Sequence, residues 1–159
     1  MIPVDYNKLA NALEENRQSF LSAAPFPHIV IDNFLTVDAA DVLLAEFGDD
    51  REWSHYNHYN ERKMGFTELD ALGEDVQSVI RELSSARFLD WLSQLSEIDG
   101  LLADPDLDGG GLHCIGQNGF LNIHADFQSH TKRPHWSRQL NLLLYLNKDW
   151  QEEWGGQLE

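Results

Sequence analysis

A histidine and an aspartate stand two residues apart in the stretch FLNIHADF, as His124 and Asp126. In a β-strand, residues i and i+2 point to the same face, so these two side chains would share one space. Imidazole and carboxylate are two of the three ligands in the two-histidine, one-carboxylate triad that binds non-haem Fe(II). Seven histidines and fifteen aspartates give about 0.7 such triplets by chance in a chain of this length. The spacing by itself therefore favours a solvated strand end over a metal site.

A second stretch, RQLNLLLYLNKDW, begins at Arg138 and carries Tyr145 within a run of leucines. On residue types alone it is a buried strand, and a buried tyrosine must find a hydrogen-bond partner for its hydroxyl. A backbone group is the simpler partner, and a bound ligand is the alternative.

Other segments have ligand-binding alternatives. DPDLDG matches the first half of a calcium loop, but Ile115 stands where the bidentate glutamate is needed, so a turn is favoured. HYNHY, residues 55–59, is typical of ordinary packing, with metal binding or a lid over a substrate site as the alternatives. His113, His130 and His135 flank the His-x-Asp motif, and no spacing rule assigns any of them to the same site.

The elements that must position these residues change in type along the chain. Helices are predicted over about 5–23, 36–47, 73–83 and 85–98. Strands are predicted over 28–31, 112–115, 119–127 and 138–147, and residues 53–66 are expected to form a hairpin or a long loop. Helices first and strands later predict an α+β fold, in which helices back a mostly antiparallel sheet.

Composition narrows the function classes. A chain of 159 residues with 42% hydrophobic content has the size of one globular domain. Its net charge of −16 repels phosphate backbones and anionic lipid surfaces, so neither nucleic acid nor a membrane is an expected partner. We expect a cytoplasmic protein, because one cysteine allows no internal disulfide, the N-terminus is unlike a secretory signal, and no apolar run spans a bilayer.

Five segments together resemble a known family: PFPHIVIDNFL, DPDLDGGGLH, GFLNIHADF, RQLNLLLYLNKDW and WGGQLE. They occur in the order seen in 2-oxoglutarate- and Fe(II)-dependent dioxygenases of the prolyl 4-hydroxylase type. The chain is most similar to the branch of ribosomal-protein prolyl hydroxylases and their bacterial relatives, from about Pro25 onward. The resemblance implies a double-stranded β-helix, or jelly roll, with N-terminal helices packed on one sheet, as a single domain over residues 1–159.

The resemblance also implies a site. His124 and Asp126 match the first two iron ligands, and Tyr145 matches a tyrosine that in several relatives hydrogen-bonds the distal carboxylate of 2-oxoglutarate. Leu143 would line the cosubstrate pocket, and Arg138 matches a basic residue near its mouth. The implied cofactors are Fe(II), 2-oxoglutarate and ascorbate. The implied reaction couples decarboxylation of 2-oxoglutarate to hydroxylation of a prolyl residue or a related protein or small-molecule substrate.

The sequence departs from the family pattern at its end. The family's distal histidine and its cosubstrate-binding arginine or lysine lie beyond the GG-x-L turn, where this sequence stops. We therefore expect a C-terminally truncated jelly roll with a half-built iron site, no assigned catalytic residue and no activity as it stands. The alternatives are a non-catalytic jelly roll that binds a partner or forms a homodimer through exposed sheet edges, and a metal-independent cupin-like binding module.

Overall fold

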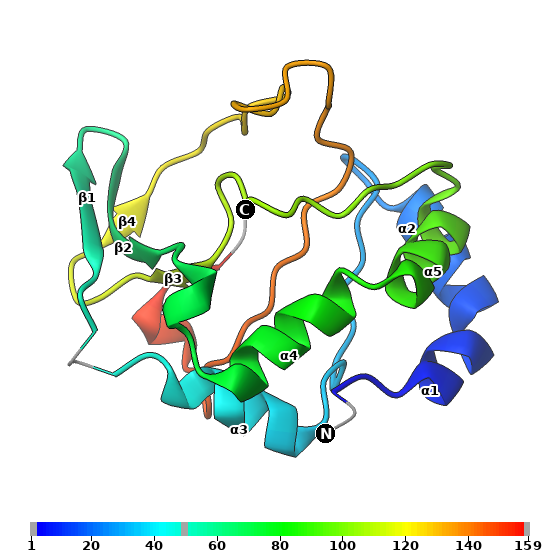
Figure 1. Ribbon diagram of the computed structural model, residues 1–159, viewed down its shortest axis with the longest axis horizontal. Coiled ribbons are helices and arrows are strands. Elements are labelled where there is room, and N and C mark those ends of the chain that lie inside the picture. Colours follow the sequence, from blue (N-terminus) through cyan, green and yellow to red (C-terminus); the bar gives the residue numbers. More distant parts are fainter. Residues whose placement is uncertain (1–2, 49–50, 158–159) are drawn as a thin grey trace. The chain divides into compact units, whose positions relative to one another are not determined.

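The computed structural model describes residues 3–48 and 51–157. These residues form two compact units: a first unit of residues up to Leu43 with Gly73–Pro105, and a second unit of Leu44–Leu72 with the residues from Asp106 onward. Whether they act as the single domain predicted above stays a prediction. The elements in Figure 1 are α1 (Tyr6–Asn11), α2 (Leu13–Ser22), α3 (Val37–Ala45), β1 (Ser54–His58), β2 (Glu61–Phe66), η1 (Leu69–Ala71), α4 (Glu74–Leu83), α5 (Ala86–Ser96), β3 (Leu112–Cys114), β4 (Phe120–Leu121) and η2 (Glu152–Trp154). No helix among the described residues is long and apolar enough to cross a membrane.

The first unit begins with two short helices where one was predicted. Asp5 caps α1, because its carboxylate accepts the backbone N–H groups of Asn7 and Lys8. Ala12, at φ −97° and ψ 1°, separates α1 from α2. The helical pattern was therefore predicted correctly, and the break was not.

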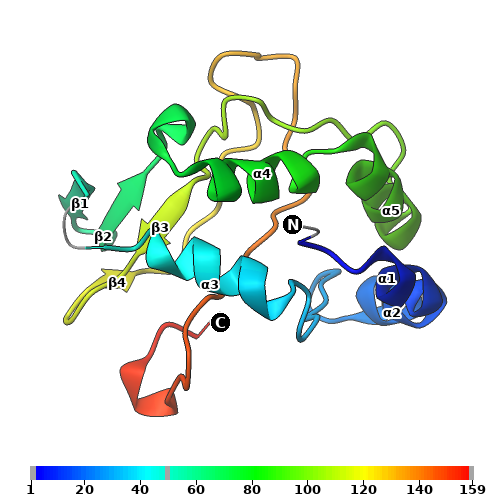
Figure 2. The same ribbon diagram turned by 60° about the horizontal axis from the view of Figure 1, so that its bottom comes forward.

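The core of the first unit is aromatic. Phe88 and Trp91 of α5 are buried and stacked, with ring centroids 5.6 Å apart, and the edge of Phe34 meets Phe88 at 5.8 Å. Ser85 begins α5 by accepting the N–H of Phe88. Figures 1 and 2 both show α2 beside α5. The predicted strand over 28–31 is wrong: Ile29 and other residues pack on this core as irregular chain.

The second unit carries an antiparallel sheet in which β2 is central. β1 and β2 form a hairpin, which decides between the two structures expected for residues 53–66. The end of β2 pairs with β3, where Phe66 lies opposite Leu112, and the beginning of β2 pairs with β4, where Glu61 lies opposite Leu121. Helices combined with an antiparallel sheet confirm the α+β class. The jelly roll that the resemblance implies is not formed by these strands.

Two strand predictions near the His-x-Asp motif need correction. The predicted strand over 119–127 is limited to β4, and the predicted strand over 138–147 is not formed within the part of the chain that the structure describes. The reason is that neither segment has, among the described residues, a neighbouring strand with which its whole length can form backbone hydrogen bonds. β4 pairs with the start of β2, and beyond Leu121 it meets the hairpin turn at Tyr59 and Asn60, where the partner strand ends. Residues 138–147 run extended with half-exposed leucines and no ladder.

Candidate functional site

The segment that carries the His-x-Asp motif is fixed just beyond the end of β4. Asn122 donates its backbone N–H to the carbonyl of Asn60 at 2.9 Å, and its side chain donates to the carbonyl of Tyr59 at 3.2 Å. Residues 122–128 then continue outside any strand. His124 and Asp126 therefore stand on an anchored irregular segment, and not on the continuous strand that the pattern predicted.

His124 and Asp126 nevertheless point toward one another. The Nε2 atom of His124 lies 3.5 Å from Oδ1 of Asp126. Nδ1 of the imidazole lies 2.8 Å from the carbonyl oxygen of Asn122, and because a carbonyl only accepts, Nδ1 is the donor in this hydrogen bond. The other ring nitrogen, Nε2, is the one that faces the carboxylate. The side chains of His124 and Asp126 are 37% and 42% exposed, so the pair is open to solvent.

The second carboxylate oxygen of Asp126 has its own partners. Oδ2 lies 2.8 Å from Nη1 of Arg138 and 3.2 Å from Nδ2 of Asn141. The guanidinium of Arg138 also lies 4.1 Å from the ring centre of Phe127, and its Nη2 donates to the carbonyl of Asp108 at 2.9 Å. Arg138 was predicted from the sequence, whereas Asn122, Asn141 and Phe127 carried no signal that singled them out.

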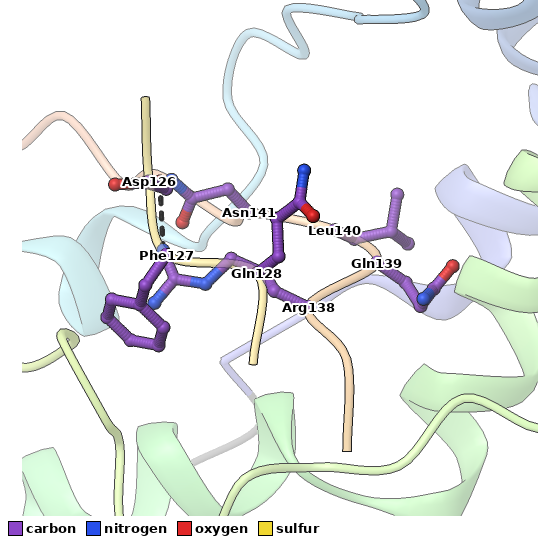
Figure 3. A pocket seen from close by; sticks show the side chains of 7 residues that line it. All are labelled: Asp126, Phe127, Gln128, Arg138, Gln139, Leu140 and Asn141. Carbon is purple, nitrogen blue, oxygen red and sulfur yellow. Dashed lines mark hydrogen bonds and ion pairs between the residues drawn. The ribbon is translucent and has the colours of Figure 1, made fainter. Parts of the chain in front are cut away.

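A shallow pocket of about 230 Å³ adjoins this cluster. Its lining residues are Asp126, Phe127, Gln128, Arg138, Gln139, Leu140 and Asn141. Figure 3 shows Arg138 reaching Asp126 beside Phe127, while the side chain of Gln139 points away from Asp126.

The other predicted cosubstrate residues lie apart from this pocket lining. Tyr145 is 66% exposed and Leu143 is 50% exposed, and neither lines the pocket. Both belong to the extended segment after Asn141, whose backbone pairs with no strand among the described residues. The structure therefore brings His124, Asp126 and Arg138 together and does not bring Tyr145 and Leu143 to them. Their role toward 2-oxoglutarate stays a prediction.

His130 stabilises the loop in which it lies. Its ring is buried, and Nδ1 accepts the backbone N–H groups of Lys132 and Arg133 at 3.0 and 3.2 Å. Asp106 pairs with both of these basic side chains, and Asp108 accepts the N–H of Thr131 at 2.7 Å. These bonds tie the loop around His130 to the Asp-rich segment. His130 is thus committed elsewhere and does not complete the His124 site.

The aspartates of DPDLDG are likewise engaged in protein contacts. Asp106 and Asp108 face Lys132, Arg133 and backbone N–H groups, and β3 follows where a calcium loop requires a helix. The turn that the sequence favoured is therefore the better description. No group of three metal-ligating side chains in residues 3–48 and 51–157 includes His124 or Asp126.

The hairpin carries a separate charged cluster. Glu61 accepts from Lys63 and from His58, each at 2.8 Å. The hydrogen bond from Lys63 in particular holds the pKa of Glu61 below its usual value. Partial burial, reinforced by the Lys63 charge, lowers the pKa of His113. β1 is exposed along its whole length, and the substrate-lid role of residues 55–59 stays a prediction.

Comparison with known proteins gives one match, and it lies over the segment that carries the candidate site. The family described as the 2OG-Fe(II) oxygenase superfamily matches residues 110–159. The matched segment contains His124, Asp126, Arg138, Leu143 and Tyr145. No curated protein and no solved structure shows a significant match. The match supports a 2OG-Fe(II) oxygenase superfamily member, and with it the iron and 2-oxoglutarate chemistry of that class.

Proposed function

We propose that this protein is a 2-oxoglutarate- and Fe(II)-dependent dioxygenase of the prolyl-hydroxylase type, which hydroxylates a prolyl residue or a related substrate. One observation carries the proposal. Within the segment that matches the oxygenase family, Nε2 of His124 and Oδ1 of Asp126 lie 3.5 Å apart.

The donor chemistry of this pair fits iron. Two ligands held about 2.1 Å from one ion are at most about 4.2 Å apart, so 3.5 Å lets a single ion contact both atoms. Imidazole nitrogen and carboxylate oxygen are also the ligand types of the Fe(II) triad. When bound, Fe(II) supplies the activation of O₂ that accompanies decarboxylation of 2-oxoglutarate.

The chain's own groups prepare the pair. The carbonyl of Asn122 keeps the proton on Nδ1 of His124, which leaves Nε2 free to bind. Tyr145 and Leu143 are proposed to contact 2-oxoglutarate once the segment after Asn141 is ordered around it. This proposal follows the family resemblance, and it requires that exposed segment to change position.

Two protein donors are one fewer than the triad supplies. We therefore expect residues 1–159 alone to bind Fe(II) weakly and to give no turnover, because no third histidine or carboxylate among the described residues joins the pair. Ascorbate, which the resemblance implies, would act only in a complete site.

Titration with Mn(II), a redox-stable substitute for Fe(II), tests the proposal in the full 159-residue chain. Paramagnetic broadening of amide NMR signals should begin at residues 122–128 and be lost in His124→Ala and Asp126→Ala. His135→Ala is the control, because His135 is an exposed histidine in the following loop, and it should leave the broadening unchanged. Broadening that persists in His124→Ala, or that begins elsewhere, would reject the site.

A succinate assay with Fe(II), 2-oxoglutarate and ascorbate tests whether this 159-residue chain is itself active, which is a separate question from whether it belongs to the dioxygenase class. Succinate formation that depends on His124 would support the dioxygenase function and contradict the predicted inactivity. Absence of succinate together with the site-specific Mn(II) effect is the result we expect.

A further inference from the structure

Arg138 is held by three kinds of contact at once. Its Nη1 pairs with Asp126 at 2.8 Å, its Nη2 donates to the carbonyl of Asp108 at 2.9 Å, and its planar face lies on Phe127 at 4.1 Å. The side chain is 23% exposed, so most of it is shielded from water. A guanidinium held at two nitrogens and one face has a fixed position and little freedom to follow a ligand.

The backbone supports this position. The N–H of Arg138 donates to the carbonyl of Gln128 at 2.8 Å, and Ser129 and Ser137 form an antiparallel bridge beside it. The segments that carry Asp126 and Arg138 are therefore aligned by main-chain bonds. Their ion pair is a consequence of this alignment as well as of charge attraction.

The two carboxylate oxygens of Asp126 have different partners. Oδ2 receives both Arg138 and Asn141, whereas Oδ1 faces Nε2 of His124. A carboxylate without such partners rotates about a soft torsion and presents either oxygen. Here one oxygen is anchored and the other is left for a ligand.

We propose that Arg138 and Asn141 are positioning residues that anchor Oδ2 of Asp126 and so reserve Oδ1 for the metal that His124 binds. The inference rests on the proposed function. It gives Arg138 a different role from the cosubstrate contact that the family resemblance implies, because its two terminal nitrogens and one face are already engaged by the protein. Partners of this kind typically contribute 10–100-fold to metal affinity.

The charge of Arg138 must be separated from its geometry. A guanidinium close to a metal ion repels it, so deleting the charge would add an attraction that hides a loss of alignment. Two variants avoid this problem. Asn141→Ala removes a neutral anchor, and Arg138→Lys keeps the charge but cannot make both terminal N–H contacts and the stacking. Neither variant changes the net charge at the site.

The affinity for Mn(II) is measured by titrating the full chain and monitoring the broadening of the amide NMR signals of residues 122–128. Asn141→Ala and Arg138→Lys should each weaken binding by about tenfold or more. Asn147→Ala and Arg62→Lys are the matched controls, because Asn147 and Arg62 are exposed and do not line the pocket beside Asp126. Both variants should bind Mn(II) like the parent chain. Parent-like affinity in both Asn141→Ala and Arg138→Lys would overturn the inference.

A metal-free measurement distinguishes failure of this inference from failure of the proposed function. Restricted rotation of the Arg138 guanidinium should give resolved terminal N–H signals, and these should collapse in Asp126→Asn. If the parent chain binds no Mn(II) at the pair, the dioxygenase proposal fails, and collapse of these signals still supports the anchoring of Asp126. Signals of Nη1 that persist unchanged in Asp126→Asn would show that this nitrogen does not bond to Asp126 and would overturn the anchoring itself.

Discussion

Replacement of Gly109 by alanine should destabilise the second unit by about 2–4 kcal/mol, in two separable parts. Gly109 has φ +73°, a left-handed conformation that costs alanine about 1–2 kcal/mol. Its added Cβ would also lie 2.8 Å from Cε1 of Phe127 and 3.0 Å from Nη2 of Arg138. The ring and the guanidinium must then move, and losing their stacking and the hydrogen bond to Asp108 costs about 1–2 kcal/mol more.

Equilibrium unfolding in urea measures the total, and Gly156→Ala isolates the first part. Gly156 belongs to the same unit and also has a positive φ, of +84°, but a Cβ there meets nothing within 4 Å. It should lose only about 1–2 kcal/mol. Equal losses in the two variants, with the guanidinium signals of Arg138 unchanged in Gly109→Ala, would refute the close packing on which the reasoning depends.

Three further predictions concern stability. Phe88→Ala should cost the first unit about 3–5 kcal/mol in urea unfolding, since Phe88 is fully buried and stacked; a loss below about 1 kcal/mol would contradict its central place in the core. Ser85→Ala should cost about 0.5–2 kcal/mol through loss of the α5 cap, and Ser84→Ala, which removes no such cap, should cost less. The lowered pKa of Glu61 means that the native state binds fewer protons than the unfolded chain, so its contribution is complete above pH about 4.5 and is lost as pH falls further. Glu61→Gln should flatten this part of a stability–pH curve, and an unchanged slope would refute the role of its contact with Lys63.

The helices could be predicted from sequence because their signals are local. Ser85 stands at the start of α5, and apolar residues recur at helical spacing through α4 and α5, so both were found within a few residues. The break at Ala12 was missed because alanine is a strong helix former and nothing in its neighbours signals a change of direction.

The strands could not be predicted equally well, because a strand needs a partner strand, which is often far away in the sequence. The leucine-rich segment after Arg138 has strand-like composition, but its backbone finds no neighbour among the described residues. The hairpin succeeded because its two strands are adjacent in sequence and pair with each other.

The residues of the candidate site also differ in how far they could be predicted from the sequence. His124 and Asp126 were assigned to a metal site by the family resemblance, because their spacing alone favoured a solvated strand end, and the structure places Nε2 and Oδ1 3.5 Å apart. Their partners Asn122 and Asn141 are common polar residues whose importance depends on where the folded chain puts them. Arg138 was predicted only as a residue near the cosubstrate pocket, which stays a prediction, and its direct bond to Asp126 is seen only in the structure.

The central claim is that His124 and Asp126 hold one metal ion through Nε2 and Oδ1. Crystals of the full chain grown with Mn(II) test it most directly by anomalous diffraction. The account predicts one anomalous peak about 2.1 Å from both atoms, with Oδ2 of Asp126 still bonded to Arg138 and Asn141. A map with no peak at this pair, or with its peak at Asp106 and Asp108 instead, would contradict the account.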